Sequence, residues 1–94
     1  MIENIKTYNI LISGRVHGVG FRYFSVSLAD KYNIRGYVKN TSDSKVEIIC
    51  QGDEEELDCF LEDIRKGPAF SVITGIIVED VPENKIYKCF EIKY

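Results

Sequence analysis

The chain has 94 residues, of which 45% are hydrophobic and 29% charged, and 12 basic against 15 acidic residues leave a net charge of −3. This composition is typical of a globular domain and excludes disordered, collagen-like and low-complexity chains. No apolar run approaches the roughly 20 residues of a membrane-spanning helix, and we expect no secretory signal, because residues 1–6 lack its pattern of charge and hydrophobicity. An acidic chain also lacks the basic surface that general nucleic-acid binding requires.

The first half of the chain predicts a strand, a helix and a hairpin. Apolar residues alternate with polar ones over 5–12, which indicates a strand. A glycine-rich segment follows over 14–20, and apolar residues then recur every three to four positions over 21–32, as on the buried face of a helix. Strands are predicted over 36–41 and 45–51, and the short polar turn between them predicts a hairpin.

A second helix is predicted to begin after Asp53. The Asp53 carboxylate can accept a hydrogen bond from the backbone amide three residues on, and Glu56 stands where a capping box needs it. Apolar residues at helical spacing follow, and Gly67-Pro68 ends the helix. Its predicted buried face consists of Leu57, Phe60, Leu61 and Ile64.

The last part of the chain predicts a strand over 71–81, a turn over 82–84 and a final strand over 87–94. The order of elements is therefore β, α, β, β, α, β, and a fifth strand is left open. Two amphipathic helices on one face of an antiparallel sheet form the ferredoxin-like α+β sandwich, and we expect residues 1–94 to form one such domain. Because this fold supports many activities, function must be argued from a site.

The cysteines give no sign of a disulfide framework or a metal site. Cys50, Cys59 and Cys89 are odd in number, form no C-x-x-C pair and are accompanied by a single histidine. We therefore expect three reduced thiols, as in a cytoplasmic protein, each packed as a small hydrophobic side chain.

The candidate for binding or catalysis is segment 14–22, which lies between the first predicted strand and the first predicted helix. Its sequence is Gly-Arg-Val-His-Gly-Val-Gly-Phe-Arg. Unpaired N–H groups at a helix start favour an anion, and glycines let neighbouring N–H groups turn toward it. Arg22 adds a guanidinium that can bind a phosphate through two hydrogen bonds. The segment matches neither the P-loop nor the dinucleotide-binding motif. The residues alone leave open an anion site or a plain glycine-rich connection.

Segment 14–22 closely resembles the first signature of acylphosphatases, G-x-V-Q-G-V-x-F-R, and 36–47 resembles their second. The spacing between the two, Gln51-Gly52 and Gly67-Pro68 also agree, so the resemblance covers nearly the whole chain. It implies the ferredoxin-like fold and the hydrolysis of a carboxyl–phosphate anhydride to a carboxylate and inorganic phosphate. It further implies a small-molecule acyl phosphate as substrate and neither a metal nor another cofactor.

The resemblance also assigns roles to residues. Arg22 matches the catalytic arginine of the family, and Asn40 matches the asparagine that orients the attacking water. The substrate-binding residues form a segment that we call the phosphate loop: Arg15, Val16, His17, Gly18, Val19, Gly20 and Phe21. From the residues alone, Arg22 could instead be a surface arginine paired with Asp30 or Glu47, and Asn40 could merely end a strand.

Two residues depart from the family pattern. His17 stands where glutamine is usual, and we expect its ring to form a hydrogen bond within the phosphate loop. Because histidine ionises near neutral pH, His17 also predicts a pH-dependent phosphate affinity that His17→Gln would remove. Ser44 replaces the usual turn glycine after Asp43, which we expect to shape the turn. If that position needs a positive φ, serine is strained there.

Two other function classes are alternatives for this sequence. An RNA-binding module shares this topology, and Arg35-Gly36-Tyr37 begins like an RNA-recognition motif, but the next two residues and the acidic charge disagree. A non-catalytic phosphate-binding accessory module is the second alternative, since acylphosphatase-like domains also occur in larger proteins. Arg22 and Asn40 are both present, which favours the enzyme. We expect a monomer with no nucleic-acid or membrane partner.

Overall fold

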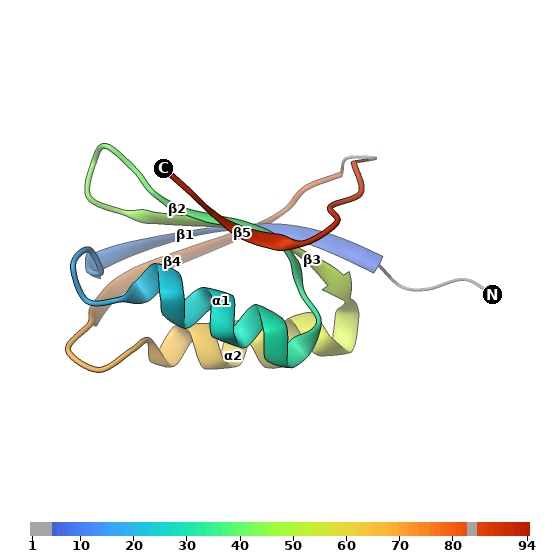
Figure 1. Cartoon of the computed structure of the whole chain (residues 1–94). Helices are drawn as coiled ribbons and strands as arrows, with labels where there is room; N and C mark the ends of the chain where they lie inside the picture. Colours follow the sequence, from blue (N-terminus) through green and yellow to red (C-terminus); the bar gives the residue numbers. More distant parts are fainter. Residues whose placement is uncertain (1–4, 83–84) are drawn as a thin grey trace.

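A computed structural model describes residues 5–82 and 85–94, and both helices lie on one face of a single sheet (Figure 1). The five strands and two helices are β1 (Ile5–Arg15), α1 (Phe21–Tyr32), β2 (Arg35–Asn40), β3 (Val46–Asp53), α2 (Glu54–Lys66), β4 (Val72–Asp80) and β5 (Phe90–Lys93). The predicted ferredoxin-like fold is confirmed, with a fifth strand. In the described part of the chain, neither helix is long and apolar enough to cross a membrane.

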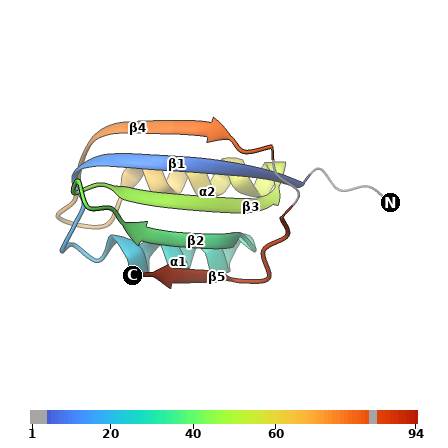
Figure 2. The ribbon, with the colours of Figure 1, turned by 90° about the horizontal axis from the view of Figure 1, so that it is seen from above.

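The strand order across the sheet is β4-β1-β3-β2-β5 (Figure 2). Antiparallel pairs join β1 to β3 and β4, and β2 to β3. The predicted antiparallel arrangement is wrong for the last strand, because β5 runs parallel to β2. Strands β4 and β5 lie at opposite edges of the sheet and run in opposite directions (Figure 2).

The strand ends differ from prediction where glycine or loop geometry intervenes. Strand β1 continues to Arg15 through an irregularity between Ser13 and Gly14. Gly14 has a φ of 125°, and a Cβ there would collide with the Val72 carbonyl oxygen, so only glycine permits this close approach to β4. Strand β5 begins at Phe90 rather than at residue 87. In the predicted turn over 82–84, residues 83 and 84 lie outside the described part of the chain.

The core fills the space between the helices and the sheet. The helices bury Phe21, Ala29, Leu57, Phe60 and Ile64, and the sheet buries Ile10, Ile12, Val38, Val46, Ile48 and Cys50. The predicted inner face of α2 is thereby confirmed at three positions, whereas Leu61 is half-buried. Each large apolar side chain buried in this way stabilises the fold by about 1.5–3 kcal/mol. The core thus gives the segment between β1 and α1 a rigid base.

The ends of the helices follow the predicted chemistry with one correction. The Asp53 carboxylate caps α2 by accepting from the Glu55 amide at 3.0 Å, and not from the amide of Glu56 as predicted. Gly67 ends α2 with a φ of 70°. Asn33 ends α1 in the left-handed conformation, where its amide donates to Ala29.

The three cysteines are free thiols in different environments. Cys50 is fully buried, as predicted, and burial raises the pKa of its thiol to about 12. Cys59 and Cys89 are exposed, so the prediction that they pack in the core is wrong. Cys59 lies on the outer face of an amphipathic helix, and Cys89 directly precedes an edge strand.

Candidate active site

The phosphate loop is fixed to the core at both ends. The side chains of Val16 and Phe21 are 1% and 2% exposed, so their predicted contribution to a site must come from the backbone. Between them, Gly18 and Gly20 have φ values of 72° and 80°, and nothing lies within 4 Å of a Cβ built at either position. These two positions therefore favour glycine because their φ values are positive, and not because a side chain would collide with neighbouring atoms.

The loop leads directly into the N-terminus of α1. Gly20 is the N-cap and provides no side chain to cap the helix. The first amide to donate within this turn is that of Phe24, to the Gly20 carbonyl oxygen at 2.9 Å. The amides of residues 21–23 precede it and have no acceptor within the helix. Together with the positive end of the helix dipole, these N–H groups favour an anion in front of the helix.

His17 connects the phosphate loop to the β2–β3 turn. Its Nε2 lies 2.7 Å from the Lys45 carbonyl oxygen, so the expected hydrogen bond exists but its partner lies outside the loop. Because a carbonyl oxygen only accepts, Nε2 must be the protonated ring nitrogen. A glutamine amide can donate the same hydrogen bond, which explains why either residue suits this position. The predicted pH dependence of phosphate affinity stays a prediction.

Arg22 and Asn40 come together at one pocket of about 130 Å³. Its lining residues are Val16, Gly18, Gly20, Phe21, Arg22, Tyr23 and Asn40. Three residues assigned to the phosphate loop, Arg15, His17 and Val19, are not in this wall. Tyr23 was missed by the sequence analysis, although its place beside Arg22 in the first helical turn is a signal that could have found it. No acidic residue lines the pocket, so the Arg22 charge is unopposed there.

Arg22 is free to bind an anion. Among the described residues, no carboxylate lies within 4.0 Å of its guanidinium, and Glu47 instead pairs with Lys39 at 3.6 Å. The alternative of a surface ion pair with Asp30 or Glu47 is therefore wrong. The Arg22 Cζ atom lies 5.3 Å from the ring centroid of Tyr94. Such a contact uses the face of the guanidinium and leaves its in-plane N–H groups for a ligand.

Asn40 is the last residue of β2 and is half-buried opposite Val46. Its backbone thus completes the strand, as the alternative interpretation held, while its side chain lines the pocket. Within the described ranges, no residue forms a hydrogen bond with the Asn40 side-chain amide. A neutral amide has both a donor and an acceptor, so it can hold a water molecule from two sides.

The turn after Asn40 is held by side-chain hydrogen bonds. The Thr41 hydroxyl donates to the Asp43 carboxylate, which lowers the pKa of Asp43, and the Lys45 amide donates to Thr41 Oγ1 at 3.0 Å. Asp43 therefore shapes the turn, as predicted. Ser44 has a φ of 67°, which confirms the expected positive φ at this position.

We predict that Ser44→Gly stabilises the protein. The substitution relieves a left-handed conformation that disfavours a side chain, while glycine adds entropy to the unfolded chain, so the net gain should be about 0.5–1 kcal/mol. Ser44 is exposed, and little packing is lost. Urea unfolding at constant m-value measures the change, and the neighbouring exposed Ser42→Gly is the control, expected to destabilise slightly. A lower midpoint for Ser44→Gly would contradict the prediction.

The described residues contain no group of three or more His, Cys, Asp or Glu side chains that could hold a metal ion.

Comparisons with known proteins agree with this geometry. The family model for acylphosphatase matches residues 8–92. The chain belongs to the acylphosphatase family. An acylphosphatase from Bacillus velezensis is 46% identical over 87 residues, which cover 93% of this chain and 97% of that protein. The crystal structure of acylphosphatase from Bacillus subtilis superposes with a TM-score of 0.91 at 41% identity and covers 96% and 99% of the two chains. The predicted family and enzyme class, an acylphosphatase, are thereby confirmed.

A larger protein contains a similar fold. Full-length HypF, in a crystal structure of its phosphate- and nucleotide-bound form, matches the whole of this chain with a TM-score of 0.93 and 40% identity. The match covers only 12% of the HypF chain. The same fold therefore occurs within a much longer protein, as the accessory-module alternative requires.

Proposed function

We propose that this acylphosphatase binds the phosphoryl group of an acyl phosphate with Arg22 and the backbone amides of the phosphate loop, while Asn40 orients the attacking water. The observation that carries this proposal is that Arg22 and Asn40 line one pocket at the start of α1, with no acidic residue in its wall. The amides at the start of α1 have no acceptor within the helix, and the Arg22 guanidinium has no carboxylate partner among the described residues, so both are suited to the phosphoryl oxygens. The neutral amide is suited to a water molecule.

The reaction needs positioning more than acid–base catalysis. Water attacks phosphorus, the bond from phosphorus to the bridging oxygen breaks, and the electron pair leaves with a carboxylate, which is already a good leaving group. Both water protons end on the phosphate, so an acyl phosphate dianion and water give one carboxylate and one dihydrogen phosphate. Phosphoryl transfer of this kind is accelerated mainly by alignment and charge stabilisation. A separate general base is then unnecessary, because a phosphate oxygen can accept the proton.

Turnover of a model substrate tests this function. We expect the folded protein to hydrolyse benzoyl phosphate and acetyl phosphate in the presence of EDTA, at a rate unchanged by added Mg²⁺. Release of inorganic phosphate and loss of the acyl phosphate are measured together, and their ratio should be one. Activity that EDTA removes and Mg²⁺ restores would contradict the metal-independent mechanism.

The similarity to one part of HypF favours a second candidate, a phosphate-binding module without useful turnover. This candidate predicts that the protein binds inorganic phosphate through Arg22 but hydrolyses neither model substrate. Calorimetric titration with phosphate, carried out beside the turnover assay, separates the two candidates.

We further propose that the chain acts as a cytoplasmic monomer on a small molecule, without a nucleic-acid or membrane partner. Three free thiols suit a reducing compartment. A net charge of −3 disfavours nucleic acid and anionic lipid surfaces. Four residues of the phosphate loop line the same pocket as Arg22 and Asn40 within one chain, which supports a monomer.

A further inference from the structure

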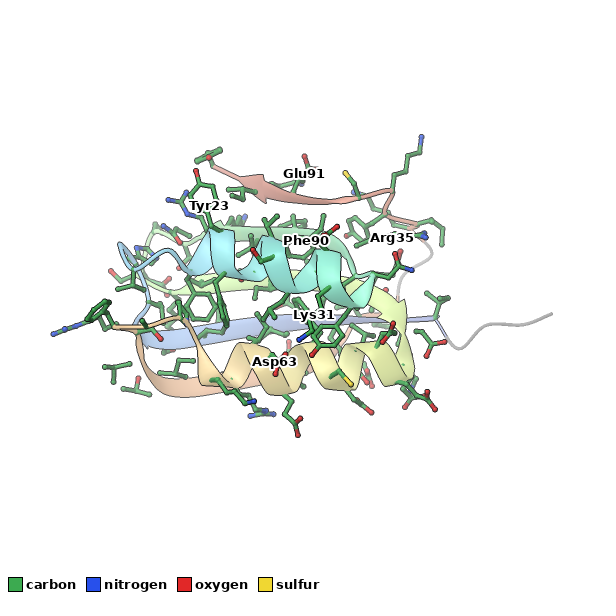
Figure 3. All side chains as sticks on the ribbon, turned by 60° about the horizontal axis from the view of Figure 1, so that its bottom comes forward. Tyr23, Lys31, Arg35, Asp63, Phe90 and Glu91 are labelled. Carbon is green, nitrogen blue, oxygen red and sulfur yellow. The ribbon has the colours of Figure 1, made fainter. Side chains whose placement is uncertain are left out.

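Tyr23 follows Arg22 in the first turn of α1 and is one of the residues that line the candidate active-site pocket. Despite this position, Tyr23 is 67% exposed. Figure 3 shows the ring projecting from α1 on the side of β5, away from the core between the helices and the sheet. Packing of the core therefore does not explain why a large aromatic side chain stands at this position.

A second aromatic ring lies beside the same arginine. Tyr94 is 93% exposed, and its ring centroid lies 5.3 Å from Arg22 Cζ. Two exposed rings, one from α1 and one from the last residue of the chain, thus lie next to the guanidinium proposed to bind phosphate. Exposed aromatic surface beside a concave polar site is a common mark of ligand binding.

The size of the pocket determines which part of the substrate reaches Tyr23. Pockets that enclose a whole drug-sized ligand have volumes of about 300–1,000 Å³, whereas this one has about 130 Å³. It is therefore suited to the phosphoryl group and the attacking water alone. The acyl group must extend to the rim, where Tyr23 presents its ring.

We propose that Tyr23 is a specificity-determining residue whose ring packs against the acyl group, so that the enzyme favours acyl phosphates with an aromatic or large apolar acyl group over small aliphatic ones. Stacked or edge-to-face aromatic pairs gain more than their buried area alone provides, and an acetyl group offers too little surface for either. This inference rests on the proposed function and adds the substrate class to it.

The test compares kcat/KM for benzoyl phosphate with kcat/KM for acetyl phosphate in each variant. We expect Tyr23→Ala to lower the benzoyl-to-acetyl ratio by about 3- to 10-fold. Tyr23→Phe keeps the ring and should keep the ratio, which separates stacking from hydroxyl chemistry. Phe70→Ala is the matched control, because Phe70 is another exposed aromatic residue, 86% exposed, that does not line the pocket. We expect Phe70→Ala to leave the ratio unchanged.

The possible outcomes separate this inference from the proposed function. If Tyr23→Ala lowers kcat/KM equally for both substrates, or for neither, Tyr23 does not select the acyl group. The inference is then wrong, while the hydrolase mechanism stands. If Tyr23→Ala fails to fold, Tyr23→Leu keeps an apolar side chain without a ring face, and an unchanged ratio in that variant would overturn the inference as well. If the folded wild-type protein hydrolyses neither substrate, the proposed function fails and this inference fails with it.

Discussion

Replacing Arg22 by alanine is expected to lower kcat/KM for benzoyl phosphate by about 10³-fold or more. Loss of one preorganised donor to a developing oxyanion costs about 10²–10³-fold, and arginines that stabilise a transferring phosphoryl group are worth about 10³–10⁵-fold. The proposed mechanism gives Arg22 both roles. In support, Arg22 lines the pocket and no described carboxylate lies within 4.0 Å of its guanidinium. Phosphate release under saturating and subsaturating substrate measures the loss. We expect kcat to fall and KM to rise, since in the proposed mechanism the guanidinium contacts the phosphoryl group both before and during the reaction.

Two further arginine variants make this prediction specific. Arg22→Lys keeps the charge but loses the planar pair of donors, so we expect it to restore only a small part of the activity. Arg35→Ala removes another arginine, which Figure 3 shows at the far end of the molecule from Tyr23, and its activity should match that of the wild type. Near-normal turnover by folded Arg22→Ala would refute the assignment of Arg22.

The parts of the fold that were predictable depend on local patterns. The period of the apolar residues identified α1 and α2, and the Asp53 cap and Gly67 marked the limits of α2. The phosphate loop was predictable for the same reason. Glycines between a strand and a helix indicate a backbone that can adopt positive φ values and approach an anion at the helix N-terminus. Its roles in binding came from the family resemblance and remain proposals.

The parts that were not predictable depend on contacts between distant segments. The parallel pairing of β5 with β2 follows from where the chain goes after β4, which no local pattern encodes. The contact of Tyr94 with Arg22 and the hydrogen bond from His17 to Lys45 join residues 72 and 28 positions apart. The exposure of Cys59 was not predicted because that prediction rested on residue type alone, and residue type does not indicate which face of a helix a residue occupies.

Asn40→Ala is expected to lower kcat by about 10²–10³-fold and to change KM little. In the proposed mechanism Asn40 aligns the attacking water and does not bind the phosphoryl group, so the substrate should still bind. The inhibition constant of inorganic phosphate should likewise stay close to that of the wild type, whereas Arg22→Ala should weaken it. This difference between the two variants assigns one group to the phosphate and the other to the water.

The control for Asn40 is Asn9→Ala, which removes a side-chain amide from β1 of the same sheet, two strands away from β2. Asn9 donates to Glu47 at 3.1 Å and does not line the pocket, so activity should be unchanged. If Asn40→Ala instead raised KM and the phosphate inhibition constant as strongly as Arg22→Ala does, Asn40 would be a phosphate ligand and the water would need another partner. The backbone amides of the phosphate loop are the candidates for that partner, because the other residues of the pocket wall, apart from Arg22 and Tyr23, belong to this loop. The KM and the phosphate inhibition constant of Asn40→Ala therefore decide between a mechanism in which Asn40 orients the water and one in which it only stabilises charge on the phosphate.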